Sequence, residues 1–185
     1  MSITTVSIAL STGIATTAST SSPRVRDKLH AFASEEAKQI FWECFQKYTT
    51  LLGFVPWVTS LLDNHYHTVG YLKMGENLGE MMRLIHGSIA KRVNDLLPER
   101  IKPFWYDSGK QGYFDGCLRD EFQGRHTLRY VRLQAVRNGI VLDYRDYPHT
   151  RVNVEMEVAI RRAIESNAFM EGVEYKRYAR ARRAR

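Results

Sequence analysis

The sequence predicts an α+β sandwich of the ferredoxin-like (RRM-like) type, an antiparallel sheet with helices on one face. Three observations lead to this prediction. Segments with two-residue alternation are interspersed with segments whose apolar residues recur at spacings of three and four. Their order is strand, helix, strand, strand, helix, strand, which is the order of that fold. The 185 residues are 44% hydrophobic and 25% charged, values typical of a folded globular domain.

The first expected element is a strand at residues 6–10. Val6, Ile8 and Leu10 alternate with small or polar residues, which is typical of a strand with one buried face. Residues 1–22 contain no charged side chain and no long apolar run, which argues against a signal peptide. We therefore expect a first strand and a loop in this segment.

The first helix is expected to begin after Ser34, a suitable N-cap, and to end at Gly53. Its buried stripe consists of apolar residues at helical spacing: Ala37, Ile40, Phe41, Cys44, Phe45 and Tyr48. A hairpin is expected next, because residues 63–64 are Asp-Asn, a turn sequence. This predicts one strand at residues 54–62 and a returning strand at residues 65–72.

A second helix is expected from Asn77, which forms a capping-box pattern with Glu80. The aromatic residues 104–106 predict a short strand after it. A third helix is expected at residues 120–137, because Asn138-Gly139 is a typical helix end. Residues 140–142 would form a short final strand. A C-terminal helix is expected at residues 155–166.

Positive charge is concentrated at the C-terminus. The net charge is +7, and residues 175–185 contain six basic residues and no acid, which leaves the rest of the chain close to neutral. Such a run, with interleaved tyrosines, suits contacts to phosphates and bases. We therefore divide the chain into a domain at residues 1–150 and a helix with a basic tail at residues 151–185. No apolar run is long enough to span a membrane, and two cysteines suit a reducing cytoplasm.

His65 and His67 are the first candidates for chemistry. Alternate side chains of a strand share a face, so these two imidazoles would project together while Tyr66 points to the other side. Two imidazoles arranged in this way can bind a divalent cation.

Tyr130 and Gln134 are the second candidates, because residues four apart lie on one face of a helix. A phenol beside an amide suits attack on a phosphodiester, with a cation partly held by the amide oxygen. Because a phenol has an ordinary pKa of about 10, it needs such a cation or a base to react at neutral pH.

In combination these motifs resemble the single-tyrosine HUH transposases, and among them the REP-associated tyrosine transposases. The similarity covers roughly residues 30 to 150. Residues 64–67 resemble the family's metal-binding strand, and residues 76–94 resemble the helix that follows it. Residues 104–106 resemble its Trp-containing strand. Residues 128–141 and 146–148 resemble its catalytic helix and the loop after that helix.

The resemblance implies the HUH endonuclease fold, with Tyr130 as nucleophile and with His65, His67 and Gln134 as ligands of Mg²⁺ or Mn²⁺. It implies cleavage and rejoining of single-stranded or hairpin DNA through a 5′-phosphotyrosine. The protein would be cytoplasmic, at the nucleoid, and a monomer or homodimer. Two departures stand out: Gln134 is followed by Ala135 where the family has an Asn-Pro pair, and residues 106–111 lack the family's arginine.

Contacts to the DNA backbone are expected from basic residues on or beside the third helix: Arg125, Arg129, Arg132 and Arg137. The tail adds further candidates: Lys176, Arg177, Arg180, Arg182 and Arg183. Two alternatives stay open. The protein could bind single-stranded or hairpin nucleic acid without cutting it, or it could be a nuclease of the replication-initiator or relaxase kind.

Overall fold

The computed structural model describes residues 6–10, 15–17, 25, 29–72, 75–105, 118 and 120–165. Its sheet has five strands in the order β1-β2-β4-β3-β5. They are β1 (Val6–Leu10), β2 (Ala15–Thr17), β3 (Phe54–Leu62), β4 (His65–Leu72) and β5 (Thr150–Val152). The predicted tail and residues 106–117 lie outside the described residues.

The hairpin of β3 and β4 forms the centre of the sheet. Its register runs from Phe54 opposite Leu72 to Leu62 opposite His65, as the turn at residues 63–64 predicts. Strand β1 runs parallel to β4, and β5 runs antiparallel to β3. Together with the intervening helix, this arrangement confirms the expected α+β class.

Helix α1 (Glu35–Leu52) begins and ends where its local signals predict. The Ser34 hydroxyl accepts a hydrogen bond from the Ala37 amide at 3.1 Å, and Gly53 ends the helix with φ of 75°, a left-handed conformation that glycine adopts readily. Helix α2 (Asn77–Asn94) differs from expectation. Asn77 is already helical, and its side chain donates to the Leu52 carbonyl instead of capping α2.

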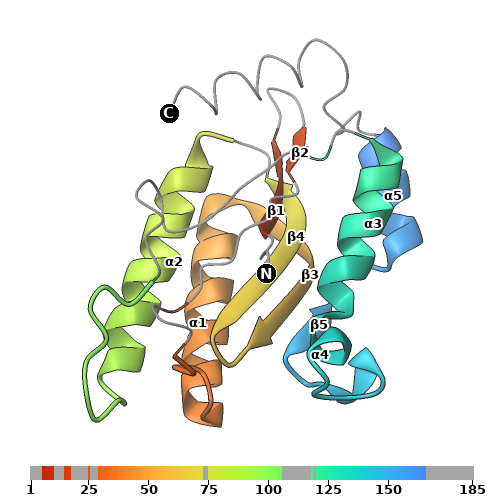
Figure 1. The fold of residues 1–185 in the computed structure, drawn as a ribbon. Helices are drawn as coiled ribbons and strands as arrows, with labels where there is room; N and C mark the ends of the chain where they lie inside the picture. The colour runs from red at the N-terminus through yellow and green to blue at the C-terminus, as the bar shows by residue number, and fades with distance from the viewer. Residues whose placement is uncertain are drawn as a thin grey trace.

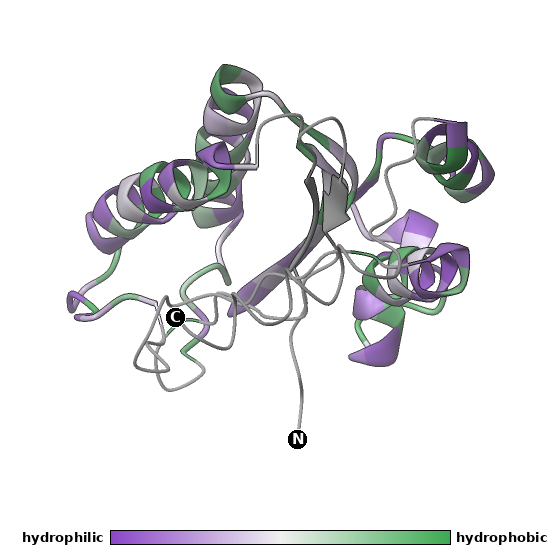
Figure 2. Cartoon of the chain, turned by 90° about the horizontal axis from the view of Figure 1, so that it is seen from above, coloured by the Kyte–Doolittle hydropathy of each residue, from purple (hydrophilic) through white to green (hydrophobic). Residues whose placement is uncertain are grey.

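The helices cover both faces of the sheet rather than one (Figure 1). Helices α1 and α2 lie on one side, and α3 (Glu121–Arg132) and α5 (Met156–Glu165) lie on the other. Figure 2, seen from above, shows the same three layers. The cause is visible in β4, which is buried along nearly its whole length, so that both of its faces require a covering layer.

Each face of the sheet therefore contributes to its own hydrophobic core. The first core lies against α1 and α2 and includes Phe41, Phe45, Leu61, Tyr66 and Ile85. The second core lies against α3 and α5 and includes Trp57, Val69, Leu128, Val131 and Ile160. Because side chains alternate along a strand, Tyr66 enters the first core and its neighbours His65 and His67 point to the opposite side.

Two expected strands are absent from the described residues. Residues 140–142 form no strand, because Leu142 is 99% exposed and the chain continues into the 3₁₀ turn η2 (Tyr144–Asp146). The strand that completes this edge is β5, eight residues later. Of residues 104–106, Trp105 makes only an isolated bridge to Val25. In the described part of the chain, no helix is long and apolar enough to cross a membrane.

Candidate active site

His65 and His67 lie together on β4, as the strand alternation predicts. Both are buried, and their ring centroids are 5.1 Å apart. The Nδ1 atom of His65 lies 2.5 Å from Oδ1 of Asn64. Because a carbonyl oxygen only accepts hydrogen bonds, Nδ1 carries the proton, and the neutral ring keeps its lone pair on Nε2. The partner Asn64 thus prepares His65 to act as a ligand through Nε2.

Tyr130 stands in the last turn of α3 and packs against this histidine pair. Its ring centroid is 5.5 Å from that of His67, with the two planes nearly perpendicular. The Arg137 guanidinium lies over the Tyr130 ring, 4.8 Å from its centroid. The tyrosine is half-buried, so its ring is held by its neighbours while part of it faces solvent. The structure therefore brings three of the predicted site residues to one place.

Gln134 occupies a different local structure from the one expected. The predicted continuous helix over residues 120–137 is wrong, because α3 ends at Arg132 and the short helix α4 (Gln134–Arg137) follows. Leu133 between them has φ of −92° and ψ of 11°, which departs from helical geometry. The buried Gln134 side chain still returns to the tyrosine, since its Nε2 donates to the Tyr130 carbonyl at 3.2 Å.

These residues fit a divalent cation by the chemistry of their donors. The two imidazoles offer nitrogen lone pairs, and Gln134 offers its amide oxygen, since its nitrogen is used in the bond to Tyr130. No three His, Cys, Asp or Glu side chains gather into a metal site anywhere among the described residues. His65, His67 and Gln134 are the residues that would supply the protein's ligands to such a cation.

The arginines proposed for DNA binding are placed differently from one another. Arg125 makes ion pairs with Glu121 at 2.7 Å and with Glu157 at 2.5 Å. Arg132 lies 4.9 Å from the centre of the Tyr144 ring. Arg129 is exposed and makes no ion pair within the described ranges. Arg137 is exposed as well, so of the four arginines Arg129 and Arg137 are the two that are exposed to solvent.

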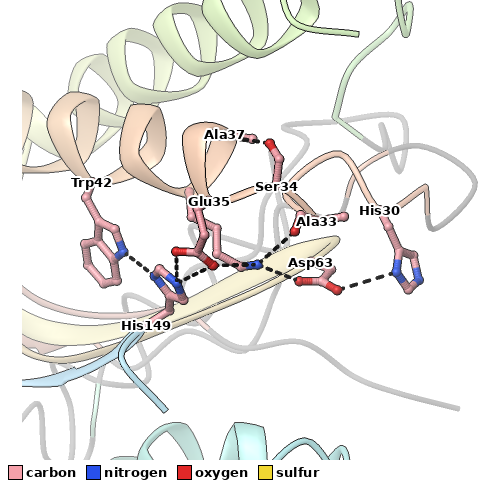
Figure 3. Close-up of polar contacts among 9 residues, drawn as sticks. His30, Ala33, Ser34, Glu35, Ala37, Trp42, Asp63 and His149 are labelled. Atoms are coloured by element: carbon pink, nitrogen blue, oxygen red, sulfur yellow. Dashed lines mark hydrogen bonds and ion pairs between the residues drawn. The ribbon is translucent and has the colours of Figure 1, made fainter. Parts of the chain in front are cut away.

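A chain of polar contacts that the sequence did not reveal supports the site from the other side of the sheet (Figure 3). The Trp42 indole donates to Nδ1 of His149 at 3.1 Å, and Nε2 of His149 lies 3.0 Å from the Glu35 carboxylate. The buried Lys38 ammonium contacts Asp63 at 3.1 Å. Burial lowers the pKa of His149, although Glu35 acts in the opposite direction. These contacts fix α1 and the segment before β5 around the turn that leads into β4.

One solved structure gives a comparison for the whole arrangement. It is a REP-associated tyrosine transposase bound to a REP hairpin, with a TM-score of 0.57 and 15% sequence identity over 80% of this chain and 79% of that chain. No protein-family model matches the sequence, and no curated protein matches it. The chain therefore has the fold that its sequence resemblance implies, the fold of the REP-associated tyrosine transposases.

Proposed function

We propose that the protein is a metal-dependent, single-strand DNA endonuclease and strand transferase of the transposase type, acting at hairpin-flanked sites. One observation carries the proposal. The His65–His67 pair on β4 and Tyr130 on α3 meet at one place, with the rings of His67 and Tyr130 5.5 Å apart. The fold around them matches that of a transposase bound to a hairpin.

The tyrosine supplies the nucleophile. The Tyr130 hydroxyl gives its proton to water and its oxygen attacks the phosphorus. The bond from phosphorus to the 3′ oxygen breaks, and the departing oxygen takes up a proton from water. The products are a 5′-phosphotyrosyl link and a free 3′-OH. The Arg137 guanidinium lies 4.8 Å from the centroid of the Tyr130 ring and helps to hold the nucleophile in position.

His65, His67 and the amide oxygen of Gln134 are the residues that would hold Mg²⁺ or Mn²⁺. Such a cation, when bound, neutralises charge on the scissile phosphate and orients it. The phosphotyrosyl link keeps the energy of the broken bond, so a 3′-OH can reverse the attack and join a new strand. This exchange requires no nucleotide cofactor.

The proposal is tested by trapping the covalent intermediate. The protein is incubated with labelled hairpin DNA that has single-stranded flanks and with Mn²⁺, and the products are separated on a denaturing gel. Tyr130→Phe should abolish the protein–DNA adduct and keep binding, because it removes one oxygen and keeps the ring. Tyr144→Phe is the matched control, since Tyr144 is a half-buried tyrosine in contact with an arginine on the same side of the sheet.

An adduct that survives Tyr130→Phe refutes the assigned nucleophile. His67→Ala should abolish cleavage with Tyr130 still in place, and unchanged cleavage would remove the histidines from the mechanism. Binding of DNA without an adduct under every metal condition would support the non-catalytic alternative instead.

A further inference from the structure

An aromatic side chain is exposed on the helix that carries the proposed nucleophile. Phe122, in the first turn of α3, is 77% exposed. Its ring is stacked on that of His126, which is also exposed, with centroids 6.5 Å apart and an angle of 23° between the planes. An exposed phenylalanine ring does not stabilise the folded state, because the favourable free energy comes from burying such a ring.

The helix geometry places Phe122 and His126 on the same side of the molecule as Tyr130, the proposed nucleophile. In an α-helix of 3.6 residues per turn, Phe122, His126 and Arg129 fall within a stripe about 60° wide, and Tyr130 lies about 40° beyond one edge of that stripe. The buried residues of α3 define the opposite face: Gly124, Thr127, Leu128 and Val131. At a rise of about 1.5 Å per residue, Phe122 lies about 12 Å along the helix axis from Tyr130.

The stripe carries one exposed cation. Arg129 is exposed at the end of the stripe nearest Tyr130. Glu121 and Glu157 share a single counter-ion, because both pair with Arg125. The Arg125 guanidinium therefore offsets one of their two negative charges.

We infer that Phe122 and His126 form a stacking platform for unpaired bases of a single DNA strand, with Arg129 contacting a phosphate of the same strand. The inference rests on the proposed function and names the surface that guides the strand to Tyr130. Stacking on aromatic rings combined with arginine contacts is the usual means of binding single-stranded nucleic acid. At about 3.4 Å per stacked nucleotide, the platform contacts bases within about four nucleotides of the scissile phosphate.

The test measures DNA binding and adduct formation with two substitutions of the exposed ring. Phe122→Ala should weaken binding of a single-stranded oligonucleotide about fivefold or more, the effect of losing one stacked base. Phe122→Trp should restore binding, because it replaces one aromatic surface by a larger one. Leu51→Ala is the control, since Leu51 is 65% exposed but lies on α1, across the sheet. A 2-aminopurine placed in turn at the four nucleotides on either side of the cleavage site should be quenched by the wild type and not by Phe122→Ala.

Failure of this inference differs from failure of the proposed function. If the wild type forms the Tyr130 adduct but Phe122→Ala binds and cleaves like Leu51→Ala, the platform is refuted and the nucleophile stands. If no adduct forms with any DNA, the proposed function fails, and the platform then depends on the binding data alone. Equal DNA affinities of the wild type and of Phe122→Ala refute the stacking platform in either case. A change of oligomeric state in Phe122→Ala with unchanged DNA affinity would assign the ring to a protein contact.

Discussion

His86→Gln should make the stability of the protein less sensitive to acid. His86 is buried in α2, its Nε2 lies 3.1 Å from the Tyr66 hydroxyl, and its ring packs 4.5 Å from that of Trp105. Burial lowers the pKa of His86 from 6.5 to about 3. The His86 imidazole is therefore neutral in the folded protein at pH values well above 3.

The sign and size of the effect follow from proton linkage. Below pH 6.5 the unfolded chain binds a proton on His86 that the folded chain does not bind until about pH 3. The contribution of His86 to the free energy of unfolding is therefore fully present above pH 6.5, and it falls as the pH is lowered from 6.5 towards 3. At about 1.36 kcal/mol for each pH unit, the loss attributable to this one residue is about 2 kcal/mol at pH 5.

Urea unfolding at pH 7.5 and pH 5.0 measures this loss. Glutamine does not titrate, and its amide can still bond to the Tyr66 hydroxyl, so His86→Gln should lose about 2 kcal/mol less than the wild type on acidification. His126→Gln, a change at an exposed histidine, should behave like the wild type. Burial also lowers the pKa of His149, so all three proteins lose stability in acid, and the comparison between them isolates His86. Equal losses in the wild type and in His86→Gln would refute the buried neutral imidazole.

Three further substitutions test the fold, and one deletion tests the tail. Gly70→Ala should destabilise the protein by about 2 kcal/mol in urea unfolding, because its Cβ would clash with a β3 carbonyl oxygen and a Phe54 ring. Gly79→Ala, in α2 with open space around it, should stabilise by about 0.5–1 kcal/mol, and equal effects at both glycines would contradict the packing argument. Lys38→Met should cost about 2 kcal/mol, measured in the same way, by removing the buried partner of Asp63. Deletion of residues 175–185 should weaken DNA binding and lower its salt slope by up to about 4 without moving the cleavage site; a moved site would show that the tail reads sequence.

Local signals in the sequence were sufficient to predict the ends of helix α1 and the orientation of the side chains on strand β4. Ser34 and Gly53 fixed the ends of α1, because a capping hydroxyl and a left-handed glycine act within one turn. The alternation of β4 placed His65 and His67 on one side, because the two-residue period of a strand leaves no other choice. These two predictions depend on a few neighbouring residues and agree with the structure, whereas the capping box at Asn77, which is equally local, does not form.

Predictions that depend on distant contacts agreed less well. The apolar residues 140–142 were expected to form a strand, yet no edge of the sheet receives them, and Leu142 lies in solvent. The actual edge strand β5 has three partly exposed residues and shows no periodicity. The second helical layer is likewise invisible to local patterns, because the burial of β4 on both faces depends on α3 and α5, which come much later in the chain.

The relation between Tyr130 and Gln134 differs from the predicted one, because the Gln134 side chain contacts the Tyr130 backbone across a break in the helix. The four-residue spacing predicted neighbours on a continuous helix, but the helix is interrupted at Leu133. The two residues remain together because the buried Gln134 amide must satisfy its hydrogen-bonding groups, and the Tyr130 carbonyl lies within reach at 3.2 Å. That bond directs the amide nitrogen to the backbone and leaves the oxygen as the group that could face a cation. The predicted role of Gln134 as a ligand therefore rests on its amide oxygen, and the structure itself establishes only the bond from the amide nitrogen to the Tyr130 carbonyl.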